Sequence, residues 1–102
     1  MANAVPAVMI RYKLRPDQVA RNLELLRAVY EEMESAPPDG VRWASFQLDD
    51  EVTFVDFVLG GGPPGQLSRL ETFQRFRTTL GERCAEPLVM TELHAVDSFG
   101  FD

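Results

Sequence analysis

Apolar residues recur at two different spacings along this chain, and the order of the spacings limits the folds it can adopt. The stretch 7–14 alternates apolar and polar positions, which is typical of a strand with one buried face. The stretch 17–36 repeats its apolar residues at steps of three and four, which predicts an amphipathic helix. The strand's buried side carries Val8, Ile10, Tyr12 and Leu14, and the helix stripe carries Val19, Leu23, Leu26, Tyr30 and Met33.

The same two spacings return in the second half of the chain. Segments 41–48 and 52–59 alternate on either side of the short polar stretch 49–51, which predicts a hairpin. Ser68 and Glu71 have the spacing of a capping box, so we expect a helix that begins at Ser68 and stops at Gly81. Residues 88–98 alternate again and predict the last strand.

The order strand–helix–strand–strand–helix–strand predicts one α+β domain, residues 1–102, with the ferredoxin-like β-α-β-β-α-β sandwich fold. Right-handed crossovers place both helices on one face of a four-stranded antiparallel sheet. We therefore expect the spatial strand order 4-1-3-2.

The two faces of this sheet differ in polarity. The positions expected to meet the helices are uniformly apolar, and they are Ile10, Phe46, Phe57 and Leu93. The opposite face mixes Trp43 with charged residues, and there Arg11 and Lys13 are expected to form cross-strand ion pairs. Their expected partners are Asp56 and Glu92. Because such a face is too apolar to stay in water, we expect the sheet of a second copy of the chain to cover it.

Charge and cysteine content argue against several functions. A net charge of -6 without a basic run repels nucleic acid and anionic lipid. The lone Cys84 cannot form an internal disulfide, and no spacing of histidine, cysteine and carboxylates favours a metal site. The glycine-rich segment 60–65 lacks the residues of a phosphate-binding loop and is expected to be a connector. Without a signal peptide or a membrane-spanning stretch, we expect a cytoplasmic protein, and we expect no cofactor.

Four segments carry a family resemblance. They are the strand Ala7–Leu14, the helix start Arg15-Pro16-Asp17, residues 70–76, and Glu86-Pro87 before the last strand. Together they resemble the dimeric α/β-barrel proteins, in particular the antibiotic-biosynthesis-monooxygenase-like (ABM-like) group. The resemblance covers nearly the whole chain but includes no strict motif. It implies a homodimer whose two sheets close face to face, with a pocket in each subunit between the sheet and the helices.

The resemblance also implies a range of activities. Members of the group include cofactor-free oxygenases of polycyclic phenols, haem-degrading proteins, and small isomerases and cyclases. The haem-degrading branch has a haem-binding histidine on the second helix, whereas this chain has no histidine between Ser68 and Leu80. Haem chemistry is therefore not expected. Residues 57–62, Phe-Val-Leu-Gly-Gly-Gly, also depart from the pattern of many relatives, which carry an acidic or aromatic residue and a tryptophan around this point, so the usual pocket chemistry of the group does not carry over to this strand.

The candidate site residues are those expected in or near the pocket. The candidate substrate-binding residues, suited to an aromatic or polyketide-like ligand, are Tyr12, Tyr30, Trp43, Phe46, Phe57, Phe73 and Phe76. The candidate catalytic residues are His94, which titrates near neutral pH, and Arg11, which could stabilise an enolate. Each also has a structural interpretation: core or interface packing for the aromatic residues, an ion pair for Arg11, and an interface contact for His94.

Two hypotheses about function follow. The first is a small-molecule-binding protein that acts as a cofactor-free monooxygenase on an aromatic compound, because such chemistry needs few catalytic groups in a dry pocket. The second is a non-catalytic dimeric binding or accessory protein. The hypotheses differ in whether a cavity exists beneath the sheet or whether Phe73 and Phe76 fill it.

Overall fold

The computed structural model describes residues 7–38, 40–60 and 67–100, and in these ranges it confirms the expected order of elements. The strands are β1 (Ala7–Lys13), β2 (Arg42–Gln47), β3 (Thr53–Leu59) and β4 (Val89–Leu93). The helices are α1 (Val19–Ser35), α2 (Glu71–Thr78) and the short α3 (Leu80–Arg83), and 3-10 turns at Pro16–Gln18 and Leu67–Arg69 precede α1 and α2. Most of the expected glycine-rich connector lies outside the described residues.

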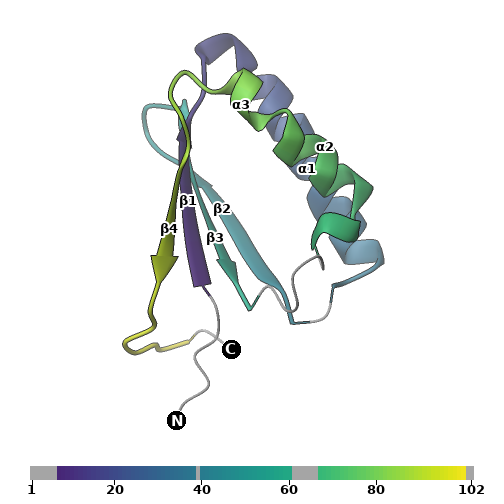
Figure 1. Cartoon of the computed structure of the whole chain (residues 1–102), viewed down its shortest axis with the longest axis vertical. Helices are drawn as coiled ribbons and strands as arrows, with labels where there is room; N and C mark the ends of the chain where they lie inside the picture. Colours follow the sequence, from purple (N-terminus) through teal and green to yellow (C-terminus); the bar gives the residue numbers. More distant parts are fainter. Residues whose placement is uncertain (1–6, 39, 61–66, 101–102) are drawn as a thin grey trace.

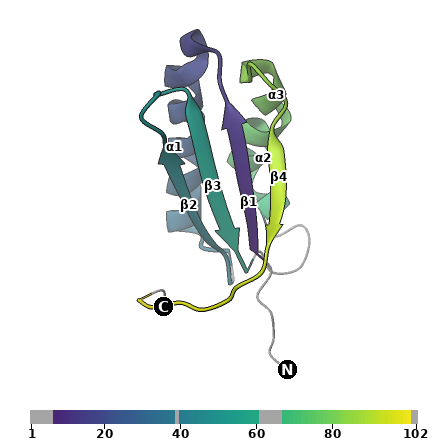
Figure 2. The same ribbon diagram turned by 90° about the vertical axis from the view of Figure 1, so that its left-hand side faces the viewer.

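The four strands form one antiparallel sheet in the order β2-β3-β1-β4, which confirms the expected topology. All the helices lie on one face of this sheet, and its other face is open (Figure 1). Figure 2 looks onto the open face, with the helices behind the strands. The last strand is shorter than expected, because β4 ends at Leu93 and the chain then leaves the sheet. Among the described residues, no helix is both long and apolar enough to cross a membrane.

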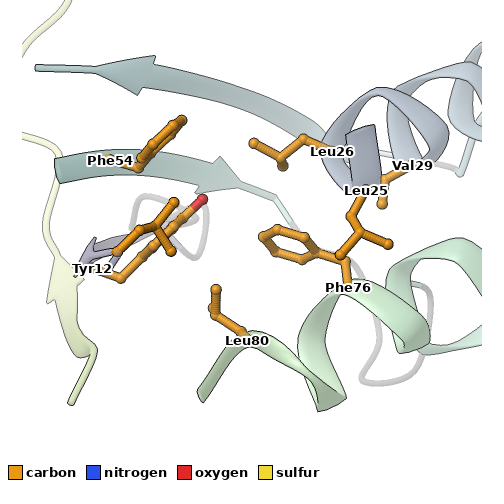
Figure 3. Packing of buried hydrophobic residues seen from close by; sticks show 8 residues of the cluster. Tyr12, Leu25, Leu26, Val29, Phe54, Phe76 and Leu80 are labelled. Atoms are coloured by element: carbon orange, nitrogen blue, oxygen red, sulfur yellow. The ribbon is translucent and has the colours of Figure 1, made fainter. Parts of the chain in front are cut away.

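The hydrophobic core lies between the sheet and the helices (Figure 3). Its centre is formed by side chains from β1, β3, α1, α2 and α3, and its members include Tyr12, Phe54, Val29, Phe76 and Leu80. Tyr12 and Phe54 stack with their ring centroids 5.5 Å apart. Burial of each large apolar side chain contributes roughly 1.5–3 kcal/mol, so this layer holds the helices on the sheet.

The expected orientation of β2, β3 and β4 is wrong. Leu93 of β4, which was expected to meet the helices, lies on the open face. Trp43 and Phe54 face the helices, whereas Phe46 and Phe57 lie on the open face with their ring centroids 5.9 Å apart. β2 and β3 alternate large apolar residues on both sides, so periodicity could not identify the core side.

The ion pairs expected for Arg11 and Lys13 are wrong for the same reason. Both cations lie on the open face, where Arg11 is opposite Val55 and Val89. Asp56 instead lies opposite Ile10 and points to the helix side.

The second helix begins later than expected and is capped by a residue of the first helix. α2 starts at Glu71 with Leu70 as its N-cap, so the expected helix start at Ser68 is wrong. Glu32 of α1 supplies a cap: its carboxylate accepts hydrogen bonds from the hydroxyl and the backbone N–H of Thr72, the latter at 3.2 Å. A carboxylate at this end of a helix is favourable. Gly81 does not end the helical region, because α3 continues through it.

Candidate functional site

A cavity of about 180 Å³ lies between the sheet and the helices. We call it the inner cavity. Aliphatic residues of β1, β3, β4 and the second helical region form part of its wall, and its aromatic and polar lining residues are Tyr12, Trp43, Asp56, Phe73, Phe76 and Arg77. The cavity therefore exists beside Phe73 and Phe76 rather than being filled by them.

Aromatic rings form one side of the inner cavity. Trp43 meets Phe73 and Phe76 edge to face, with ring centroids 5.8 Å and 6.3 Å apart. Tyr30 of α1 packs against the indole with the ring centroids 5.3 Å apart, and its hydroxyl lies 2.8 Å from the Ser45 hydroxyl. Such edge-to-face pairs hold the rings in fixed orientations. A flat apolar ligand would thus meet a preformed wall.

Among the residues that the structure describes, Asp56 is the one carboxyl group lining this cavity. Its side chain is almost completely buried, at 1% exposure, and its Oδ1 atom makes no hydrogen bond. Burial raises the pKa of Asp56 to about 6, while Ser45 and Trp43 oppose that rise by favouring the ionised form. Neither neighbour satisfies Oδ1, and Trp43 Nε1 is also buried without a partner. A buried polar atom without a partner is rare in folded proteins and marks a candidate ligand contact.

Two consecutive hydrogen bonds between buried polar side chains lead from Arg83 to the hydroxyl of Tyr12. Arg83 Nε donates to Asn22 Oδ1 at 3.0 Å, and Asn22 Nδ2 donates to the Tyr12 hydroxyl at 3.3 Å. The pKa of Tyr12 is raised, chiefly by burial and next by the charge of Asp56. Burial also lowers the pKa of the Arg83 guanidinium. Figure 3 shows the Tyr12 side chain reaching from β1 toward the helix layer.

The open face of the sheet carries a larger hollow of about 660 Å³, the outer cavity. Its walls come from all four strands and from the segment after β4, and they include Ala44, Phe46, Phe57, Leu93 and His94. Phe46 is 53% exposed and Val89 of β4 is 56% exposed. Although it is the larger hollow, Trp43 is the only one of its described wall residues with a buried unpartnered polar atom, and the ring of Trp43 packs on the helix side of the sheet.

The structure divides the sequence-predicted site residues between the two faces. Five of the seven candidate substrate-binding residues lie together in or beside the inner cavity: Tyr12, Tyr30, Trp43, Phe73 and Phe76. Phe46, Phe57 and His94 line the outer cavity, and Arg11 is exposed on the same open face. The candidate catalytic pair is therefore not brought together with the tyrosines.

Sequence reasoning missed Asp56, Asn22 and Arg83. Asp56 was assigned to the wrong face, and Asn22 and Arg83 are polar residues on helices, where an exposed position is the usual expectation. One signal was present: Asn22 lies one residue before Leu23, within the apolar stripe of the first helix. Within the described ranges, no three histidine, cysteine or acidic side chains gather closely enough to hold a metal ion.

Comparison with known proteins gives similarity at the level of structure. No protein-family model and no curated protein sequence matches the chain. Among solved structures, Rv0793 from Mycobacterium tuberculosis is 23% identical, with a TM-score of 0.75 over 92% of this chain and 97% of that one. A structure described as an antibiotic biosynthesis monooxygenase is 16% identical, with a TM-score of 0.71 over 90% of this chain and 99% of that one.

A third similar structure is SnoaB, a cofactor-independent oxygenase from Streptomyces nogalater. It is 13% identical to this chain, with a TM-score of 0.70 over 97% of this chain and 99% of that one. These matches confirm the resemblance noted in the sequence at the level of the fold: the chain has the ferredoxin-like α+β fold of the ABM-like proteins. At such identities the fold alone is shared, so function has to be argued from the site.

Proposed function

We propose that this chain binds a flat, largely apolar small molecule, of an aromatic or polyketide-like class, in the inner cavity and oxygenates it without a cofactor. The observation that carries the proposal is Asp56, whose buried Oδ1 lies without a partner in the wall of an aromatic cavity. An unpartnered buried group of this kind costs about 1–3 kcal/mol. A ligand hydroxyl that donates to Oδ1 would remove that cost.

The chemistry follows from the same carboxyl group. With a pKa of about 6, Asp56 is mostly ionised at neutral pH yet basic enough to accept a proton, as a general base requires. A phenol or enol would lose its O–H proton to Asp56, leaving the bond's electron pair on the ligand oxygen. The electron-rich anion can then be oxidised by dioxygen itself: one oxygen atom is added to the ligand, and the other leaves as water with hydrogens that the ligand supplies.

The size of the cavity limits the ligand. An engineered cavity of about 150 Å³ accommodates a benzene ring, so 180 Å³ suits one ring with substituents. A ligand with more fused rings requires Trp43 or Phe73 to move outward. Typical ligand sites measure about 300–1,000 Å³, and this difference favours a second candidate function, a binding or accessory protein without turnover.

Oxygen consumption with a panel of phenols, naphthols and anthrones tests the proposal. We expect uptake with at least one compound, loss of that uptake in Asp56→Asn, and retention of binding because the amide has nearly the same shape. Asp17→Asn, a change at an exposed position, is the matched control and should leave uptake unchanged. Binding without uptake by the wild-type protein would select the accessory function, and absence of binding by every compound would refute both.

We also propose that a second copy of this chain covers the open face. The exposed apolar side chains there include Phe46 and Val89, and the outer cavity on the same face is lined mostly by apolar residues. Contiguous apolar surface on a small protein is usually an interface, and a two-fold pair buries the same patch on both copies. This arrangement would also bury Arg11 and His94 near the interface, where their expected catalytic roles become contacts between copies.

Sedimentation velocity tests the dimer. Phe46→Glu places a charge in the apolar patch and should give a monomer, whereas Ala20→Glu adds the same charge at an exposed position on α1 and should leave the dimer intact. A wild-type monomer at all accessible concentrations, or a dimer in both variants, would contradict the proposed interface.

A further inference from the structure

Arg83 is a buried cation without an anionic partner. Its side chain belongs to a residue only 3% exposed, and within residues 7–38, 40–60 and 67–100 no carboxylate lies within ion-pair distance of it. It is held instead by neutral acceptors, Thr79 Oγ1 at 2.6 Å and the backbone oxygen of Phe76 at 3.0 Å, and lies 5.2 Å from the centre of the Phe76 ring. Because burying an unpaired guanidinium is costly, its retention calls for a specific role.

Arg83 determines which atoms donate and which accept in the series of hydrogen bonds that runs through Asn22 to Tyr12. A guanidinium can only donate, so the atom of Asn22 that faces it must be the amide oxygen. The amide nitrogen of Asn22 is then turned to the Tyr12 hydroxyl and donates to its oxygen. With its oxygen already accepting, the hydroxyl of Tyr12 has one proton left to donate elsewhere.

Tyr12 and Asp56 both line the inner cavity, so its wall contains a fixed hydroxyl donor and a fixed carboxylate acceptor, in addition to the unpartnered indole N–H of Trp43. Both residues are at least 98% buried, and no hydrogen bond joins them, so both remain available to a ligand. The remaining charged side chain among the described wall residues is Arg77, which is exposed to solvent. An anionic ligand would place its charge beside Asp56 in a medium of low dielectric and would be repelled.

We propose that Arg83, acting through Asn22, orients the Tyr12 hydroxyl as a donor into the inner cavity, so that the site selects neutral ring compounds bearing a carbonyl oxygen for Tyr12 and a hydroxyl for Asp56. This inference rests on the proposed function and names its ligand class. Arg83 and Asn22 are positioning residues. If the ligand hydroxyl loses its proton to Asp56, conjugation carries the negative charge to the carbonyl oxygen, where Tyr12 holds it.

The test compares four one-ring compounds that differ in their hydrogen-bonding groups. Ethylbenzene has neither group, acetophenone has an acceptor, ethylphenol has a donor, and hydroxyacetophenone (each ring isomer) has both. Dissociation constants are measured by ligand-observed NMR titration. The diagnostic quantity is the affinity for acetophenone divided by that for ethylbenzene, because this ratio cancels changes in cavity shape. Benzoate, the anionic analogue, is expected to bind at least about tenfold more weakly than acetophenone.

Removing the Tyr12 hydroxyl, or the residues that position it, should lower the ratio of acetophenone affinity to ethylbenzene affinity. One hydrogen bond contributes about 0.5–1.5 kcal/mol, so Tyr12→Phe should reduce the ratio about fivefold. Arg83→Met and Asn22→Leu should each cause much of the same loss. Adding Arg83→Met to Tyr12→Phe should cause no further loss, since the hydroxyl it positions is already absent. Arg75→Met, a change at an exposed arginine of α2, is the matched control and should leave the ratio unchanged.

Each outcome decides the inference. A ratio that falls in Tyr12→Phe but not in Arg83→Met or Asn22→Leu would overturn the positioning role while leaving ligand binding intact. An equal loss of affinity for all four compounds would indicate a merely structural role and would also overturn it. If Arg83→Met does not fold, Arg83→Lys, which retains a donor for Asn22, should preserve the ratio that Asn22→Leu loses. If no compound binds the wild-type protein, the proposed function itself fails.

Discussion

Replacing Asp56 with asparagine should make this protein more stable at neutral pH. In the folded protein the carboxyl group is buried with Oδ1 unpartnered, and its pKa is raised by burial to about 6 from an ordinary value of 3.8. At neutral pH the wild-type protein therefore keeps a charge in its interior that the amide of the variant does not carry. A functional group retained at a cost in stability is a common feature of active sites.

The magnitude follows from the two pKa values. They differ by about two pH units, and at about 1.4 kcal/mol for each unit the ionised carboxylate costs ~3 kcal/mol of folding free energy. Between the two values the folded state retains a proton that the unfolded chain has released. Stability is therefore lost as pH rises from about 4 to about 6 and stays reduced above that. Tyr12 and Tyr30, which face the same carboxyl group, stay neutral throughout because burial raises their pKa values.

Urea denaturation at about pH 4 and about pH 8 measures this difference. Other carboxyl groups also titrate in this range. We therefore take the change in unfolding free energy between the two pH values for each protein, and compare the change in the wild type with the change in Asp56→Asn. We expect a difference of about 2.5 kcal/mol, somewhat less than the full cost because the unfolded carboxyl group is already partly ionised at about pH 4, with the wild type losing more stability toward high pH. Asp17→Asn corrects for the altered net charge. Equal pH dependence in the wild type and Asp56→Asn would refute the assignment of a raised pKa to this carboxyl group.

Three further predictions concern other contacts. Asp50→Asn should destabilise the hairpin, because its carboxylate accepts hydrogen bonds from the hydroxyl and backbone N–H of Thr53, which lower the pKa of Asp50. This contribution is present near neutral pH and is lost as pH falls, so the deficit measured by urea denaturation should be larger at pH 7 than in acid. Glu32→Ala should cost about 1 kcal/mol in thermal unfolding and speed hydrogen exchange at the start of α2, because Thr72 loses its acceptor; an unchanged exchange rate would contradict the cap. His94→Ala should leave binding in the inner cavity unchanged in a calorimetric titration, since this side chain lies on the open face; a large loss of affinity would place the ligand there instead.

The element order and the sheet topology could be predicted because they depend on local periodicity. The long apolar stripe of α1 and the alternation of β1 each have one buried side, and β1 was oriented correctly. β2 and β3 gave no such guidance, because Trp43 and Phe46 lie on opposite sides of the same strand. A shift of one position exchanges the two faces of a strand, so one ambiguous pattern reversed every side chain of the hairpin.

The aromatic part of the candidate site was predictable, and its polar part was not. Tyr12, Phe73 and Phe76 are large residues on stripes that must meet in the core, whichever way the hairpin is oriented. The partners of Tyr12 come from two helices far apart in sequence, and Asn22 and Arg83 satisfy one another only after those helices have packed on the sheet. Polar residues in such positions resemble exposed helix residues until their contacts are known.

Trp43 gives the two cavities a shared reporter. It is the only tryptophan in the chain, and it is the one residue that lines both the inner and the outer cavity among the described wall residues. Its fluorescence would therefore respond both to a ligand beneath the sheet and to a second copy of the chain on the open face. A single emission spectrum cannot separate these two events, but titrating ligand into the monomeric Phe46→Glu variant and diluting the ligand-free wild type would record each of them alone.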